Sequence, residues 1–157
     1  MFYELMSYDV IPGRAAEFLE LCRSRGLPIR GEKYGRLEGF WRVDIGRQYQ
    51  VMHLWSHASV EARQTARLKM AEDQAWQTDF LPYCLPLMVE GETRFMSALA
   101  PLTPPPAASG IYEIRFTTTR PLKGRSWFQD QTAARAAHCV GAWQNIAGRP
   151  YEIITLL

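Results

Sequence analysis

An internal duplication is the feature that most constrains how this chain folds. Residues 39–55 recur without a gap at 141–157. The matched pairs are Gly39 with Gly141, Trp41 with Trp143, Gly46 with Gly148, Arg47 with Arg149, Tyr49 with Tyr151, and Leu54 with Leu156. Residues 3–5 return as residues 112–114, and the second copy is about seven residues shorter between the two matches, which is roughly two helical turns. The chain therefore holds one complete unit and about half of another.

The first copy alternates strand and helix patterns in the order βαββαβ. Strands are predicted at 2–11, 35–44, 48–56 and 89–99, and helices from residue 15 to the stop signals Gly26 and Pro28 and from the N-cap Ser59 to Glu72. Trp76 and Phe80 are predicted to close the end of the core. This order is typical of a ferredoxin-like α+β unit, with an antiparallel four-stranded sheet and both helices on one face.

The domain scheme follows from the repeat and from a proline-rich spacer. Residues 1–100 form the complete domain, residues 101–109 are a stiff linker, and residues 110–157 are a shortened second unit. The second unit is predicted as a strand at 111–119, a helix within 125–138, and strands at 141–145 and 151–157. It lacks a second helix and a fourth strand, so we expect it not to fold alone. The open sheet face predicts a homodimer.

Residues 1–100 also carry a family resemblance. The opening of the chain with its Pro12-Gly13-Arg14 turn, the hairpin 39–55 and the segment 76–82 together resemble the NIPSNAP family, in order along the first unit. The resemblance implies the dimeric α+β-barrel fold, in which two ferredoxin-like sheets face each other, and a poorly defined biochemical activity. Residues 110–157 are similar to a shortened second copy of the same domain.

Composition excludes several classes of protein. The 18 basic and 16 acidic residues are interspersed, so no basic stripe is present for nucleic acid. No apolar run approaches the length of a membrane span, and no basic region precedes the first strand, which predicts a cytoplasmic protein. The three cysteines form no Cys-x-x-Cys pair, and neither they nor the histidines have a metal-ligand spacing. We therefore expect no metal site and no cofactor.

His53 is the best single candidate for chemistry. It lies mid-strand on the face predicted for Tyr49 and Trp55, where an imidazole could act as a base or bind a ligand. A buried, hydrogen-bonded structural histidine is the competing interpretation. Trp41 and its repeat Trp143 could line an apolar cavity, although aromatic residues in strands more often belong to a core. The predicted ligand pocket therefore comprises Trp41, Tyr49, His53 and Trp55.

Glu4 is the second catalytic candidate, because Glu113 occupies the equivalent position in the second copy. A carboxylate on the strand face opposite Tyr3 and Leu5 could act as a general acid or base. The alternative is a structural ion pair with a residue such as Arg42 or Arg115.

These observations favour an oligomeric binding or interaction protein, without an assigned catalytic activity, that takes a small apolar or aromatic ligand or a protein partner. The alternative is an enzyme of the same barrel class, either a small cofactor-independent monooxygenase or a haem-handling protein. The alternative requires His53 to face a closed cavity.

Overall fold

The structure is a computed structural model that describes residues 1–100, 102–103, 110–135 and 139–157. It divides into two compact units, unit 1 (residues 1–93) and unit 2 (residues 94–157).

Unit 1 is built on an antiparallel sheet. Its strands are β1 (Phe2–Val10), β2 (Arg36–Arg42), β3 (Gln50–His57) and the beginning of β4 (Met88–Ala100), in the spatial order β2-β3-β1-β4. β1 and β3 pair from Phe2 opposite His57 to Asp9 opposite Gln50. All eight residues of β3 are buried.

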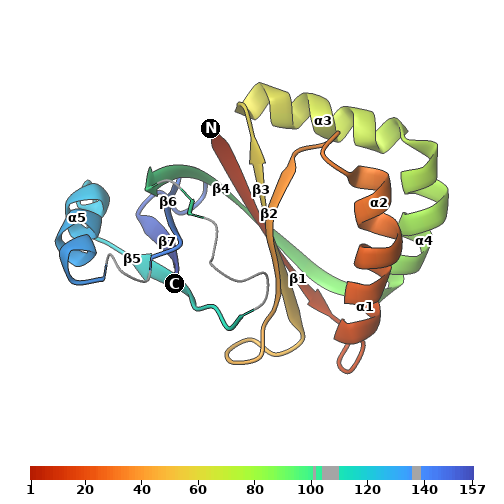
Figure 1. Cartoon of the computed structure of the whole chain (residues 1–157), viewed down its shortest axis with the longest axis horizontal. Coiled ribbons are helices and arrows are strands. Elements are labelled where there is room, and N and C mark those ends of the chain that lie inside the picture. The colour runs from red at the N-terminus through yellow and green to blue at the C-terminus, as the bar shows by residue number, and fades with distance from the viewer. Residues whose placement is uncertain (101, 104–109, 136–138) are drawn as a thin grey trace. The chain divides into compact units, whose positions relative to one another are not determined.

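The helices of unit 1 lie on one side of these strands (Figure 1). α1 (Ala15–Leu21) passes through a π-helical turn (Cys22–Gly26) into α2 (Leu27–Arg30). The expectation that Gly26 and Pro28 end the helix is wrong. Pro28 falls in the first turn of α2, where its missing N–H costs nothing, and a side chain at Gly26 would collide with the Phe80 ring. The helix therefore reaches Arg30.

The second helical segment agrees more closely with expectation. α3 (Val60–Glu72) begins at Ser59, whose hydroxyl accepts a hydrogen bond from the Ala62 N–H at 3.1 Å, as predicted for an N-cap. A π-helical turn (Trp76–Phe80), α4 (Leu81–Cys84) and a 3₁₀ turn (Leu85–Leu87) follow. Phe80 is buried in the core. The βαββαβ order and the α+β fold class are confirmed.

A β-bulge in β2 alters which residues share a face. Leu37 lies opposite Trp55 but Gly39 lies opposite Leu54, so the pairing slips at Glu38. Leu37 and Trp41, predicted on one face, are therefore on opposite faces. The strand pair is also shorter than predicted, because residues 43–49 form an irregular loop with Gly46 at φ 116°.

Unit 2 contains β5 (Ile114–Thr118), α5 (Gly124–Arg135), β6 (Gly141–Asn145) and β7 (Glu152–Leu156), together with the last residues of β4. The spatial order is β4-β6-β7-β5. Arg94 donates from Nε to Glu152 at 2.9 Å, and both residues are buried. Most of the predicted linker, 101 and 104–109, and the predicted end of the helix, 136–138, lie outside the described residues.

Candidate ligand-binding cavity

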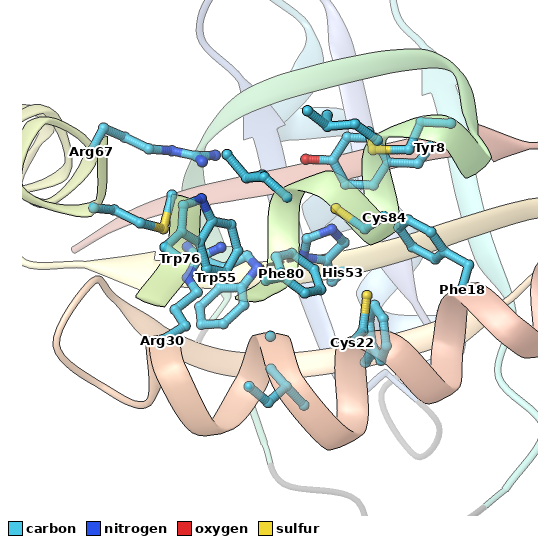
Figure 2. A pocket seen from close by; sticks show the side chains of 17 residues that line it. Tyr8, Phe18, Cys22, Arg30, His53, Trp55, Arg67, Trp76, Phe80 and Cys84 are labelled. Atoms are coloured by element: carbon cyan, nitrogen blue, oxygen red, sulfur yellow. Dashed lines mark hydrogen bonds between the residues drawn. The ribbon is translucent and has the colours of Figure 1, made fainter. Parts of the chain in front are cut away.

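A cavity of about 180 Å³ lies in unit 1 between the sheet and the helices. Figure 2 shows side chains from both layers around it. Its apolar lining includes Phe18, Leu27, Phe40, Met70, Trp76 and Phe80. The charged or titratable groups on its wall include Arg30, His53 and Arg67. Small-ligand sites combine an apolar wall with a few polar groups in this way.

His53 lines this cavity, but its chemistry is constrained. The Trp55 indole N–H donates to His53 Nδ1 at 2.6 Å. Burial, followed by the charges of Arg30 and Arg67, lowers the pKa of His53 to about 3. The imidazole is therefore neutral, and because an indole only donates, the His53 proton resides on Nε2. The lone pair that a general base needs is already engaged.

The other predicted pocket residues divide into two groups. Trp55 lines the cavity beside His53. Trp41 lies on the opposite face of β2, where its ring covers Gly39, because the bulge at Glu38 turned it away. Tyr49 sits at the end of the 43–49 loop with φ 60° and is 42% exposed. Neither Trp41 nor Tyr49 lines the cavity.

Glu4 is fully buried beneath α3 and belongs to a charged cluster. Its Oε1 accepts hydrogen bonds from Arg63 Nε at 3.2 Å and from Arg67 Nη2 at 3.1 Å. Its Oε2 lies 3.6 Å from His57 Nε2. Burial alone would raise the pKa of Glu4, but His57, Arg63 and Arg67 together lower it well below its ordinary range. Glu4 is thus a permanent anion at neutral pH.

The ion-pair partner expected for Glu4 was therefore wrong. Arg42 pairs with Asp44 instead, at 2.8 Å. Glu113, the equivalent carboxylate of the second copy, is exposed and pairs with Arg115, which was named as a partner, but within one segment and not across strands as predicted. The two carboxylates match in sequence and occupy different environments.

Arg30 is a cavity residue that the sequence did not single out. It is 3% exposed, and its guanidinium carbon lies 3.3 Å from the centre of the Trp55 ring, in a cation–π contact. Its Nη2 donates to the Tyr34 carbonyl at 3.2 Å, whereas its Nε has no hydrogen-bond partner. Burial and then the charge of Arg67 lower the pKa of Arg30 to about 9. It therefore remains a cation at neutral pH.

The cysteines are unreactive thiols at this site. Cys22 and Cys84 line the cavity, and all three cysteines are free. Burial raises the pKa of Cys22 to about 12 and that of Cys84 to about 11, so both stay protonated. Cys22 belongs to the buried core, as predicted. Across the described part of the chain, no group of three or more His, Cys, Asp or Glu side chains is placed to hold a metal ion.

An antiparallel ferredoxin-like sheet with helices on one side and a cavity between the layers defines an α+β protein of the barrel-forming class. A family model described as NIPSNAP matches residues 3–102. The chain belongs to the NIPSNAP family.

Curated relatives agree with this assignment. The chain is 29% identical to human NipSnap homolog 3A over 94% of its own length, and to zebrafish (Danio rerio) NipSnap homolog 1 it is 32% identical over 60% of its length. It spans 60% of the length of the NipSnap homolog 3A relatives and 33% of the zebrafish protein.

Solved structures show the same fold. A NIPSNAP family protein from Agrobacterium tumefaciens is 36% identical and superimposes with a TM-score of 0.59, over 62% of this chain and 91% of that one. A Lactobacillus acidophilus protein described as a candidate monooxygenase has a TM-score of 0.61 at 10% identity, over 99% of this chain and 74% of that one. At that identity the likeness establishes the fold alone.

None of the helices in the described ranges combines the length and the apolar character that crossing a bilayer requires.

Proposed function

We propose that unit 1 binds a small apolar or aromatic molecule in the cavity between its sheet and its helices. The observation that carries this proposal is the cavity itself, with about 180 Å³ of space and a mostly apolar wall. A cavity of roughly 150 Å³ in a protein core is large enough to hold benzene. The ligand is therefore about the size of one aromatic ring with a short substituent.

Filling the cavity should weaken this binding. The neutral probe 3-phenylpropanol is titrated into the whole chain and its binding measured by calorimetry. Leu81 lies on the cavity wall, so Leu81→Trp should weaken binding at least about tenfold. Tyr83 lies in the same helix, is 50% exposed and does not line the cavity, so Tyr83→Trp should leave binding unchanged. A wild-type protein that gives no binding heat at millimolar probe would refute the proposal.

The enzymatic alternative is supported by one fact, which is that His53 lines the cavity. The cavity volume favours a one-ring substrate over haem, which is a much larger macrocycle. The engagement of His53 Nδ1 by Trp55 weighs against a base at this position. Oxygen uptake by wild type, and not by His53→Gln, on mixing with a one-ring phenol would support the monooxygenase alternative. Absence of uptake by wild type would count against it.

Assembly as a homodimer is also a proposal, as is binding of a protein partner. Two arguments support a dimer, which are the sheet face that a single ferredoxin-like unit leaves open and the fold of the family. Native mass spectrometry decides, since a dimer confirms the proposal and a monomer shows that one chain covers its own sheet.

The second unit is proposed as a shortened repeat that does not fold without the end of β4. Supporting this, residues 96–100 pair with β6 and Arg94 forms an ion pair with Glu152. A 110–157 fragment should show no cooperative melt in circular dichroism, whereas a 94–157 fragment should melt more cooperatively. A cooperative melt from 110–157 would contradict the domain scheme of residues 1–100, 101–109 and 110–157.

A cytoplasmic location is proposed as well. It is supported by the three free cysteines, since thiols persist in reducing compartments. Cell fractionation with the full-length natural protein tests it.

A further inference from the structure

Binding of a neutral molecule would leave Arg30 unexplained. Its guanidinium is 3% exposed, and no carboxylate contacts it among the residues that the structure describes. The guanidinium contacts the Trp55 ring, and its Nη2 donates a hydrogen bond to the Tyr34 carbonyl, but its Nε has no hydrogen-bond partner. Burying a cation without a counter-ion costs folding free energy, and a bound anion would offset that cost.

The surrounding charges make the imbalance larger. Arg63 and Arg67 both donate to Glu4, and Arg30 lies within electrostatic range of Arg67 and Glu4. The guanidinium groups of Arg30 and Arg67 therefore both lie near the single negative charge of Glu4. The Nε of Arg67 is buried without a hydrogen-bond partner as well. The cavity wall thus has an excess of positive charge that a bound anion would neutralise.

We propose that the ligand of this cavity is a monoanionic carboxylate with an apolar or aromatic body, and that Arg30, beside Arg67, binds its carboxylate group. This inference rests on the proposed function and adds the chemical class of the ligand.

The arrangement of the wall fits such a molecule. Arg30 and Arg67 enter toward one end of the cavity, and Phe18 and Cys22 lie toward the other (Figure 2). His53 lies between these ends and, with its Nδ1 occupied, offers its Nε2–H as a neutral donor. A planar carboxylate matches the fork of a guanidinium, and Phe18 and Phe80 provide contacts for the ring.

The small number of donors argues for a carboxylate rather than a phosphate. A phosphate monoester carries close to two charges and three exposed oxygens. Most of the wall consists of aromatic and aliphatic side chains, which cannot solvate a second charge.

The test compares 3-phenylpropionate with its neutral analogue 3-phenylpropanol by calorimetry at pH 7. The carboxylate should bind wild-type protein at least about tenfold more tightly than the alcohol, because the ion pair forms away from water. If both probes bind equally, the carboxylate assignment is wrong while the cavity proposal stands. If neither binds, both are wrong. Phenylethyl phosphate serves as the competing anion, and its tighter binding would overturn the choice of carboxylate.

Two variants assign the preference to Arg30. Arg30→Met keeps the length of the side chain and removes the charge, so it should abolish the preference for 3-phenylpropionate, measured as the ratio of the affinities for the two probes. It should also raise the melting temperature of the ligand-free protein, since the unneutralised cation is gone. Arg23→Met, at an exposed site on the same helical segment, is the matched control and should change neither quantity.

If Arg30→Met fails to fold, Arg30→Lys retains the charge and should keep a reduced preference for the carboxylate. A folded Arg30→Met protein that still prefers the carboxylate tenfold would overturn the role of Arg30. A folded variant with a lower melting temperature would show that the arginine is structural, which also overturns the proposal.

Discussion

Replacing Glu4 with glutamine should destabilise unit 1 by about 3 kcal/mol, because it leaves buried guanidinium groups without their counter-ion. Glu4 is 0% exposed and accepts hydrogen bonds from both Arg63 and Arg67. Glutamine has nearly the same shape and retains one acceptor oxygen, so the loss reports the charge rather than a cavity. Urea denaturation followed by near-ultraviolet circular dichroism measures it.

The effect should depend on pH in a defined direction. The pKa of Glu4 is lowered in the folded protein, so its stabilising contribution is present above the unfolded pKa, which is about 4.3 for glutamate. The contribution is lost as the pH falls through the lower folded value. The difference between wild type and Glu4→Gln should therefore be full at pH 7 and shrink steadily below about pH 4.

Glu20 provides the control for this experiment. It pairs with Arg23 on the surface, with both side chains more than half exposed, and such pairs contribute little to stability. Glu20→Gln should leave the urea midpoint unchanged. If wild type and Glu4→Gln were equally stable at pH 7, the buried cluster would not be a source of stability.

The second large effect concerns the repeated glycine and tryptophan. Gly141→Val should destabilise unit 2 by about 3 kcal/mol, because a Cβ at this position would lie 2.5 Å from the Trp143 ring. Trp143 is 2% exposed and has no room to move aside. The backbone of Gly141 is not left-handed, so a valine is excluded by the ring and not by φ. Thermal melting followed by circular dichroism detects the loss.

Gly39→Val offers the same substitution in the first copy. There the Cβ would lie 2.1 Å from the Trp41 ring, but Trp41 is only half-buried and can rotate outward. We expect a cost of about 1 kcal/mol, partly offset by the strand preference of valine. Equal losses at the two sites would mean that the burial of the tryptophan does not control the penalty.

The sequence predicted the elements of unit 1 well, because their signals are local. The cap at Ser59, the alternation in β3 and the plug residue Phe80 each depend on a few neighbouring residues. The predictions failed where a tertiary contact overrides a local signal. Gly26 signals a helix end in isolation, yet in the fold it is the position that leaves space for the Phe80 ring.

The site was predicted only in part for the same reason. The positions of His53 and Trp55 on the cavity side follow from strand alternation. The side on which Trp41 lies depends on a β-bulge, and Gly39 is the one sequence signal for that bulge. Arg30 and Arg67 look like surface residues of amphipathic helices. One signal could have revealed Arg67: Arg63 and Arg67 lie one helical turn apart, next to the buried Ala66 and Met70.

The π-helical turn at Cys22–Gly26 is a place where this helical segment can change its length by one residue. Such a turn holds one residue more than the α-helical path around the same axis, and each residue turns the helix by about 100°. Deleting a single codon within 23–25 would remove that extra residue, restore regular α-helical winding and leave Arg30 at the same position around the helix axis. The segment could thereby become one residue shorter and still present Arg30, the proposed anion-binding side chain, on the cavity wall.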